Sequence, residues 1–308
     1  MTTNWGIVGG GFGIYGYLPA IAQKFNGDIL VLKKNFNKVS DRPELKKYIK
    51  NISYVDTYDE LIKRSTSLVL SVPPEIQEEY VYKISSKNYR YKNLILEKPI
   101  ASNSILAANI LDLSIKTADS VRVGYSFNDA SWVRILDIFS NNRKSNFLDI
   151  SWKFNAHHYR NKIDSWKIRH EKGGGILRFY GIQIIATLAS LDRTFDYIDS
   201  NIWFTENHGP FKWNASFHLA DGSNINIEVD SKSGEEKFQI SSPSKVLTLK
   251  SPFDGERAEG GDDPRVSILK KVIATDPLEN EKYYQYYYNI NKLLCDVESN
   301  TKWHNLNC

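Results

Sequence analysis

A cluster of glycines between two apolar segments constrains the start of this chain more than any other feature. A short apolar run at Ile7 and Val8 leads directly into the cluster, Gly9–Gly13. A helical pattern of apolar side chains follows from Tyr17 to Ile21. Glycine allows a sharp turn and leaves room for a ligand to approach the backbone. The stretch therefore predicts a strand, a tight turn and a helix in immediate succession.

The same turn indicates a dinucleotide-binding site. A helix N-terminus behind the glycines would offer N–H groups and a positive dipole end to a pyrophosphate. The spacing can be read in two frames: Gly9-x-Gly11 puts Ile14 at the third glycine position, whereas Gly11-x-Gly13-x-x-Gly16 fits the pattern but starts later. The alternative is a glycine-rich turn without a cofactor. The residues that we expect to contact a cofactor here are Gly9, Gly11, Phe12 and Gly13.

Composition indicates an ordinary globular protein with two domains. The chain has 308 residues, of which 41% are hydrophobic and 25% charged. The net charge of +4 is spread along the chain and does not predict nucleic-acid binding. No apolar run approaches the length of a membrane span, and the two cysteines predict no structural disulfide. We expect a cytoplasmic protein. We also expect no metal site, because no spacing of His, Cys and carboxylates suggests one.

Strand and helix patterns alternate through residues 1–123. Alternation of this kind predicts a doubly wound parallel sheet, a Rossmann domain. The expected strands are Asp28–Leu32, Ile52–Val55, Ser67–Val72, Asn93–Leu96 and Ser120–Val123. The expected helices are Tyr58–Arg64, Glu75–Ser85 and Ser104–Ile115.

Residues 124–308 predict a second, α+β domain. Longer strands with two-residue alternation indicate an open, mostly antiparallel sheet with one wet face. The expected strands are Phe147–Phe154, Tyr197–Phe204, Phe211–Leu219, Asn224–Val229, Lys237–Ser241 and Lys245–Lys250. The expected helices are Ser131–Phe139, one entered through Gly173–Gly175, and Glu281–Val297.

Two lysines follow the second predicted strand. An acidic residue at this point would accept the ribose hydroxyls of NAD. The chain has Lys33 and Lys34 instead, which could pair with a 2′-phosphate. This favours NADP(H), with NAD(H) as the other possibility; the alternative is that both lysines are solvated surface.

Four features in this order resemble the glucose–fructose oxidoreductase, inositol dehydrogenase and rhizopine catabolism (Gfo/Idh/MocA) family. They are the N-terminal glycine turn, Pro73–Pro74 after the fourth strand, Glu97-Lys98-Pro99 after the fifth, and the glycine triplet that opens a helix in a strand-rich second domain. The resemblance covers nearly the whole chain and implies NAD(P)-dependent oxidation or reduction of a hydroxyl or carbonyl on a sugar, polyol or sugar nucleotide. It also implies a homodimer or homotetramer formed through the second sheet.

The resemblance implies that Lys98 contacts the nicotinamide ribose and the substrate, with Pro73 and Glu97 beside the cofactor. A partly desolvated lysine beside a cationic nicotinamide should have a lowered pKa and can donate to the reacting oxygen. The structural alternative for Lys98 is a surface lysine in a turn.

The helix after the glycine triplet departs from the family pattern. The positions of the usual acid–base pair, an Asp and a His four residues apart, hold Phe179 and Gln183. Gln183 can hydrogen-bond a hydroxyl but cannot take a proton at neutral pH. Tyr180 could donate a proton if its pKa were lowered, or it could fill the core. Arg178 is a candidate for a substrate carboxylate or phosphate, with a surface role as the alternative.

Two further segments can approach the substrate in the family fold. Tyr159 and Trp166 are the substrate-binding candidates that they contribute. A histidine there, His157, His158 or His170, could replace the missing base, although a structural role fits each one better. We expect His157 and His158 to end a strand and to point to opposite faces of it, so that they cannot share one pocket.

Two function classes therefore stay open. The first is an NAD(P)-dependent oxidoreductase that uses Lys98, Tyr180 and Gln183. The second is a protein that binds dinucleotide or sugar nucleotide in a regulatory or scaffold role without turnover. A redox-neutral sugar-modifying enzyme is a third possibility, and it needs a base that the sequence does not place.

Overall fold

The structure, a computed structural model, describes residues 4–134, 136, 147–191, 193–256, 260–274 and 276–306. Its contacts divide the chain into two compact units. The first unit comprises Met1–Ala101, Ile105–Ser126 and Gly255–Gln285. The second comprises Ser102–Ser104, Phe127–Asp254 and Tyr286–Cys308.

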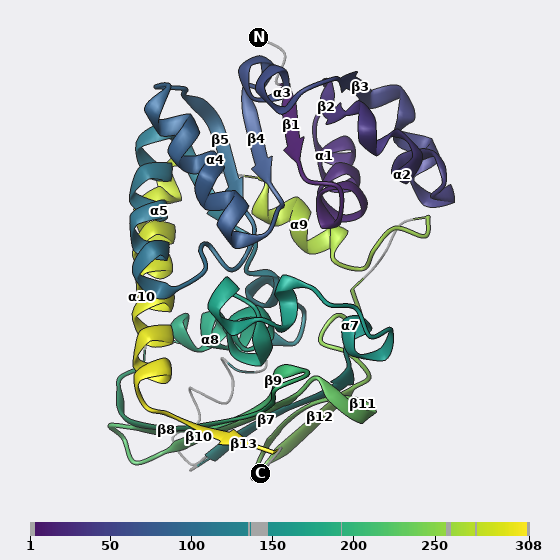
Figure 1. The fold of residues 1–308 in the computed structure, drawn as a ribbon. Coiled ribbons are helices and arrows are strands. Elements are labelled where there is room, and N and C mark those ends of the chain that lie inside the picture. The colour runs from purple at the N-terminus through teal and green to yellow at the C-terminus, as the bar shows by residue number, and fades with distance from the viewer. Residues whose placement is uncertain are drawn as a thin grey trace. The chain divides into compact units, whose positions relative to one another are not determined.

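The first unit is built on a parallel sheet of six strands. The strands are β1 (Trp5–Val8), β2 (Ile29–Leu32), β3 (Ile52–Val55), β4 (Ser67–Leu70), β5 (Tyr91–Leu96) and β6 (Ala118–Val123). They lie in the order β3-β2-β1-β4-β5-β6, and every neighbouring pair is parallel. Figure 1 shows β3, β2, β1, β4 and β5 in this order. The strands β1, β2 and β4 are buried along their whole length, as their continuous apolar runs require. This order confirms the predicted Rossmann domain.

Helices connect these strands. A π-helical turn, Gly13–Tyr17, leads into α1 (Leu18–Lys24), and the others are α2 (Phe36–Ser40), α3 (Tyr58–Arg64), α4 (Pro74–Ser86) and α5 (Ser104–Thr117). A further helix, α9 (Val266–Val272), comes much later in the chain. The predicted helices correspond to α3, α4 and α5. No pattern predicted α2, the 3₁₀ segment Pro43–Asn51 that follows it, or α9.

A late segment of the chain returns to complete the first unit. Val266 and Leu269 of α9 join the buried core that contains Trp5 and Leu18. Before α9, the Asp262 carboxylate is buried, and one of its oxygens accepts hydrogen bonds from the hydroxyl of Tyr48 (2.7 Å), the amide of Gln23 (2.8 Å) and the ammonium of Lys47 (3.1 Å). Through these hydrogen bonds, Asp262 links the returning loop to α1, which carries Gln23, and to the segment Pro43–Asn51, which carries Lys47 and Tyr48.

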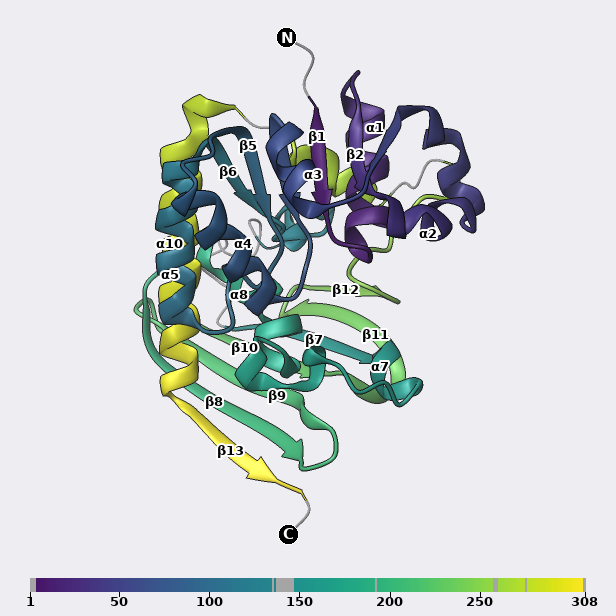
Figure 2. The same cartoon turned by 45° about the horizontal axis from the view of Figure 1, so that its top comes forward.

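The second unit is built on a sheet of seven strands. They are β7 (Phe147–Asn155), β8 (Phe195–Thr205), β9 (Gly209–Leu219), β10 (Asn224–Asp230), β11 (Lys232–Ser242), β12 (Lys245–Leu249) and β13 (Thr301–Asn305). Their order is β12-β11-β7-β10-β9-β8-β13, and Figure 2 shows β8 and β13 side by side. The pairs β7–β10 and β8–β13 are parallel and the remaining pairs antiparallel. The prediction of a mostly antiparallel sheet is confirmed, with β13 as an unpredicted edge strand.

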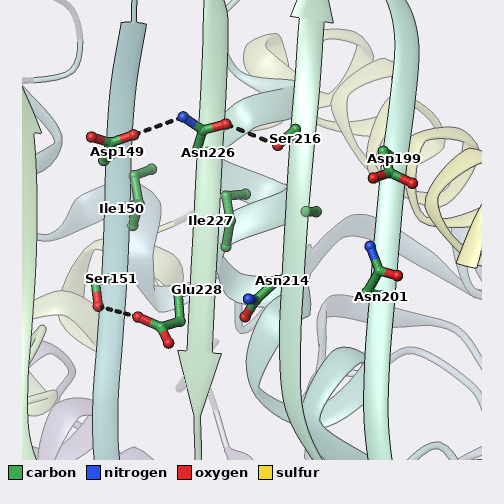
Figure 3. Close-up of a pocket in the computed structure, with 11 residues that line it drawn as sticks. Asp149, Ile150, Ser151, Asp199, Asn201, Asn214, Ser216, Asn226, Ile227 and Glu228 are labelled. Atoms are coloured by element: carbon green, nitrogen blue, oxygen red, sulfur yellow. Dashed lines mark hydrogen bonds between the residues drawn. The ribbon is translucent and has the colours of Figure 1, made fainter. Parts of the chain in front are cut away.

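One face of this sheet carries helices and the other is polar. The helices of the unit include α7 (His157–Arg160), α8 (Ile182–Ala189) and the later part of α10 (Asn280–Ser299). Figure 3 shows the polar face, where the amide of Asn226 donates to Asp149 (2.8 Å) and the hydroxyl of Ser216 donates to Asn226 (2.9 Å). Side chains alternate along β9 and β10 between this face and the buried one, so the predicted wet face is confirmed.

Aromatic side chains form the core under the covered face. Phe127 lies within 5.4 Å of Trp132 and 5.3 Å of Trp152 between ring centroids, and Phe238 lies 4.8 Å from Trp132. The predicted helix Ser131–Phe139 lies partly outside the described residues. The final predicted helix corresponds to α10, and the predicted glycine-entered helix corresponds to α8 with the π-helical turn Ile176–Gly181 before it.

Candidate active site

The glycine turn in the first unit contains glycines of two kinds. Gly9 has φ 138°, and a Cβ there would lie 2.1 Å from the carbonyl oxygen of Ser71. A Cβ on Gly13 would lie 2.8 Å from a methyl group of Ile7. A Cβ on Gly11 would meet nothing within 4 Å. Packing therefore explains Gly9 and Gly13, whereas Gly11 leaves the backbone open to a ligand.

Phe12 anchors this turn inside the unit. Its ring makes edge contacts with Tyr15 and Tyr17, at 5.4 Å and 5.5 Å between centroids. The guanidinium of Arg265 lies 4.2 Å from the ring centroid and is held by Asp263 at 2.7 Å. The Phe12 side chain is thus occupied by packing, and what the residue can offer a cofactor is its backbone.

The two predicted phosphate-binding lysines lie at the carboxyl end of β2 and are exposed. The ammonium of Lys33 lies 3.9 Å from the Asp56 carboxylate, and both side chains are more than 70% exposed. The ammonium of Lys34 lies 4.7 Å above the ring of Tyr58. Exposed contacts of this kind are weak, so a phosphate could displace either one.

A third lysine, Lys38 of α2, comes closer to the turn. Its Nζ lies 2.7 Å from the place where a Cβ on Gly10 would sit. Beside it, the buried side chain of Asn35 donates to the carbonyl of Gly9 (3.5 Å). The sequence analysis did not single out Lys38, which lies on α2 four residues after Lys34.

The loop after β5 holds Lys98, which is half-buried, and its peptide bond to Pro99 is cis. The backbone N–H of Lys98 donates to the carboxylate of Glu97 (2.9 Å). Gln77 of α4, which is fully buried, clamps the loop: its carboxamide oxygen accepts from the Glu97 N–H (2.9 Å), and its nitrogen donates to the carbonyls of Glu97 (2.9 Å) and Ile100 (2.8 Å). Gln77 is a positioning residue that sequence reasoning missed, because a lone glutamine in a helix has no distinguishing pattern.

These pieces meet at one edge of the first sheet. The strands β1, β4 and β5 are parallel neighbours, so their carboxyl ends lie together. The glycine turn follows β1, Pro73 begins the connection after β4, and Lys98 follows β5. The strand order reverses between β1 and β4, which is where open α/β sheets bind ligands.

In the second unit, the glycine triplet opens the π-helical turn that carries Phe179. Its ring contacts Trp166 (5.2 Å) and Tyr180 (4.7 Å) edge to face. Gln183 on α8 is buried, and its oxygen accepts from the N–H of Phe127 (3.3 Å). Neither residue can take a proton from a substrate at neutral pH.

Tyr180 packs among aromatic rings. Its ring lies 4.8 Å from Phe154, 5.7 Å from Trp152 and 6.1 Å from His158. Burial raises the pKa of Tyr180 well above its ordinary value. The lowered pKa that a proton-donor role required is therefore not found.

Arg178 lies in an internal network. Its guanidinium contacts the Glu298 carboxylate (2.5 Å) and donates to the carbonyls of Ser102 (2.8 Å) and His170 (3.0 Å). Its side chain is only 13% exposed, so it is not a surface residue, and its charge is already paired.

The expectation for His157 and His158 was wrong in its local structure. Both lie on the helical turn α7, because β7 ends at Asn155. His157 is exposed and His158 is buried. Burial lowers the pKa of His158 to about 4 and that of His170 to about 3, with nearby positive groups adding to the effect. Tyr159 donates its hydroxyl to the carbonyls of His208 (3.0 Å) and Pro210 (3.3 Å).

Within each unit the structure thus gathers part of the predicted set. The first unit brings together the glycine turn, the basic side chains after β2 and the Lys98 loop. The second brings together Trp166, Phe179 and Tyr180. Among the residues that the structure describes, no group of His, Cys, Asp or Glu could hold a metal ion. No helix in the described ranges is both long and apolar enough to cross a membrane.

Solved structures share this fold at low sequence identity. A 3-ketoreductase from Actinomadura kijaniata, crystallised with NADP and TDP-benzene, is 11% identical over 99% of this chain and 100% of its own, with a TM-score of 0.72. A D-galactose-1-dehydrogenase from Rhizobium etli is 18% identical over 99% of this chain and 97% of its own, with a TM-score of 0.71. The WlbA dehydrogenase from Thermus thermophilus, in complex with NAD and UDP-GlcNAcA, is 12% identical over 98% of this chain and 95% of its own, with a TM-score of 0.68. No protein-family model and no curated protein sequence matches the chain.

Proposed function

We propose that this chain is a divergent Gfo/Idh/MocA oxidoreductase that uses NAD(P) to oxidise or reduce a hydroxyl or carbonyl of a sugar, polyol or sugar nucleotide. The observation that carries the proposal is the shared sheet edge at which the glycine turn, Pro73 and the Lys98 loop begin. The names of the structural neighbours support it, because they include dehydrogenases and a ketoreductase bound to NAD or NADP.

The preferred cofactor is NADP(H). Three lysines, Lys33, Lys34 and Lys38, lie on the segment after β2, where a carboxylate would favour NAD. The open backbone at Gly11 would let the pyrophosphate approach closely. The other proposed cofactor contacts are Gly9, Phe12, Gly13, Pro73, Glu97 and Lys98.

The nicotinamide, when bound, supplies or accepts the hydride, so the protein must position the substrate and move one proton. Lys98 is the proposed catalytic residue: its ammonium donates a proton to a carbonyl oxygen that is being reduced, and its amine accepts one from a hydroxyl that is being oxidised. Gln77 and Glu97 hold the backbone of Lys98 in place through the hydrogen bonds described above.

The second unit contributes the proposed substrate contacts. Trp166 offers an aromatic surface and Gln183 a hydrogen bond to a hydroxyl. Tyr180, with its raised pKa, acts as a hydrogen-bond donor and not as a general acid. Tyr159 and Arg178 are already held by internal hydrogen bonds, so we assign them the shaping of the site.

A catalytically degenerate binding protein is the second candidate. Phe179 and Gln183 favour it, because neither can serve as the acid–base group of that helix. In this case the chain binds dinucleotide or sugar nucleotide in a regulatory or scaffold role. We further propose a homodimer or homotetramer through the polar face of the second sheet, and a cytoplasmic location.

Cofactor binding and turnover distinguish the candidates. We expect NADPH fluorescence to show tight binding, and NADPH oxidation with keto-sugars or keto-sugar nucleotides to depend on Lys98. Lys98→Met should lower kcat by about 10²–10⁴-fold while leaving the NADPH Kd within a few fold. The matched control is Lys92→Met, an exposed lysine on β5.

Binding without turnover on any substrate would favour the degenerate candidate. Failure of both NADPH and NADH to bind would overturn the oxidoreductase proposal.

A further inference from the structure

One oxygen of the Glu97 carboxylate holds the backbone of Lys98, and a glycine lies beside it. Oε1 of Glu97 accepts the hydrogen bond from the Lys98 N–H at 2.9 Å. The neighbouring strand β6 ends at Val123, and the N–H of the next residue, Gly124, donates to the carbonyl of Leu96 at 2.9 Å. This hydrogen bond fixes Gly124 beside the start of the Lys98 loop.

Two side chains meet in front of Gly124. A Cβ on this residue would lie 2.6 Å from the hydroxyl oxygen of Tyr17 and 2.7 Å from Oε1 of Glu97. Real Cβ atoms do not come this close to another heavy atom, so the two oxygens fill the space that a side chain would need. The Tyr17 hydroxyl and the carboxylate oxygen that holds Lys98 are therefore neighbours.

Tyr17 is firmly held by the glycine turn. It is the last residue of the π-helical turn Gly13–Tyr17, and its side chain is fully buried. Its ring packs edge to face on that of Phe12, at 5.5 Å between centroids. Because protein interiors are close-packed, a buried ring of this kind cannot swing away. The position of its hydroxyl is thus fixed by the same turn that we propose to hold the cofactor.

A phenol hydroxyl suits this place chemically. An ionised carboxylate only accepts hydrogen bonds, whereas a tyrosine hydroxyl can donate. Inside a protein, the attraction between a hydroxyl dipole and a carboxylate is stronger than in water. The hydroxyl of Tyr17 therefore favours the orientation of Glu97 in which Oε1 faces the Lys98 N–H. A phenylalanine at position 17 would fill nearly the same volume without this attraction.

We infer that Tyr17 is a positioning residue for Lys98, that it acts through the carboxylate of Glu97, and that residue 124 must be a glycine because a side chain there would displace this carboxylate. In this role Tyr17 transfers no proton itself. The inference deepens the proposed function, on which its kinetic part rests. Its structural part concerns the Lys98 loop alone and can be measured without cofactor or substrate.

Amide hydrogen exchange of the full chain without cofactor tests the structural part. In Tyr17→Phe, we expect the Lys98 amide to exchange about fivefold faster than in the wild type, because its acceptor is less well held. The Glu97 amide, which Gln77 holds, should keep its protection within about twofold. Gly124→Ala should act in the same direction as Tyr17→Phe, because its methyl group would push Oε1 of Glu97 aside.

Tyr91→Phe is the matched control. It removes a buried hydroxyl at the opposite end of β5, where Tyr91 donates to the carbonyl of Ile62 at 3.1 Å. This variant reproduces the general loss of stability that comes with the loss of a buried hydroxyl. It should leave the exchange of the Lys98 amide unchanged relative to that of the Glu97 amide.

Turnover tests whether the positioning matters for the chemistry. With NADPH and a keto-sugar substrate, Tyr17→Phe should lower kcat about fivefold or more, because a displaced catalytic group loses its alignment with the reacting atoms. The NADPH Kd should stay within about twofold of the wild type. In the Lys98→Met background, Tyr17→Phe should have no further effect on kcat, because Tyr17 acts through Lys98. A merely structural role would lower kcat by the same factor in both backgrounds.

The inference is overturned if the Lys98 amide exchanges at the wild-type rate in Tyr17→Phe and Gly124→Ala, or if Tyr91→Phe speeds it as much. In a chain that turns over, an unchanged kcat in Tyr17→Phe also overturns it, as does an equal loss of kcat with and without Lys98. A wild-type chain without turnover would contradict the proposed function alone, and the amide exchange would still decide the inference. A melting curve checks that Tyr17→Phe folds, and Gly124→Ala decides if it does not.

Discussion

The two units each contain a glycine cluster that opens a π-helical turn and an α-helix, and the surroundings of the two clusters differ. In the second unit, a Cβ on Gly174 would lie 2.1 Å from the carbonyl oxygen of Trp166, and one on Gly181 would lie 2.9 Å from the ring of Trp213. In the first unit, Gly11 has open space around it. Packing thus requires Gly174 in the second unit, as it requires Gly9 and Gly13 in the first, whereas Gly11 leaves the backbone accessible.

The surroundings of a glycine separate a structural role from a functional one. A glycine whose missing side chain is replaced by protein atoms is explained by the fold itself. A glycine with empty space around it and an ordinary backbone angle is not explained by the fold, and at Gly11 we propose that a bound cofactor explains it. Substitution separates the two, because the first kind affects stability and the second kind affects binding.

The largest effect is expected for Gly174→Ala. The new methyl group would collide with the backbone at Trp166 and Lys167, which cannot move as a side chain can. We expect a loss of about 3 kcal/mol in the free energy of unfolding, measured by urea titration. Gly234→Ala is the matched control, because a Cβ there meets nothing within 4 Å. Equal stability of both variants would show that packing does not require a glycine at position 174.

The two units should also differ in their response to acid, since all six histidines lie in the second unit. The pKa of His158, about 4, and that of His170, about 3, lie below the unfolded value of about 6.5. The unfolded chain therefore binds more protons between these values, and stability falls as pH decreases from 6.5 toward 4. Each of the two histidines should contribute a loss of about 2 kcal/mol between pH 7 and pH 5.

Urea titration at each pH measures this loss. His158→Asn and His170→Asn together should flatten the dependence, and His157→Asn, at an exposed position, should not. If the free energy of unfolding of the double variant falls with pH as steeply as that of the wild type, other groups cause the loss.

Gly11→Ala is the counterpart of the first prediction. Its methyl group meets no protein atom, so stability should stay within about 0.5 kcal/mol of the wild type. The NADPH Kd should rise about tenfold, which corresponds to about 1.4 kcal/mol, because the methyl group would keep the pyrophosphate away from the backbone. Fluorescence titration gives the Kd. Unimpaired NADPH binding would remove Gly11 from the cofactor site.

The smallest effect is expected for Lys38→Gln. In the proposed site this exposed lysine would donate a charged hydrogen bond to the 2′-phosphate, so NADPH binding should weaken about fivefold without it. NADH, which lacks that phosphate, should bind as before. Lys46→Gln, at another exposed position, controls for the change in net charge. If NADPH and NADH both bind more weakly by the same factor, Lys38 contacts the pyrophosphate and not the 2′-phosphate.

The sheet elements were predictable because their apolar patterns are continuous in β1, β2 and β4 and alternating in β9 and β10. The short elements were not. The helix α9 has only seven residues, and it is stabilised by packing against α1, which lies far away in the sequence. The segment Lys33–Asn51 has no long period, and β13 follows the last helix without a turn signal.

The candidate site was predictable only in outline. The glycine turn and Lys98 follow from local pattern, whereas the contribution of Gln77 depends on a loop that folds back onto its helix. For Tyr180 the sequence left a proton donor and a core residue as alternatives; in the structure its neighbours are aromatic rings and burial raises its pKa. Arg178 forms an ion pair with Glu298, a residue far along the chain that no local pattern connects to it.

The buried carboxylate of Asp262 has a consequence for the order in which this protein can be made. It lies in the segment Gly255–Gln285, which belongs to the first unit although the chain builds most of the second unit before reaching it. On a ribosome, residues 127–254 emerge while the N-terminal sheet still lacks α9 and the Asp262 hydrogen bonds. Nascent chains stalled shortly before residue 255 should therefore be cleaved by protease within the first unit, and chains released after residue 285 should resist.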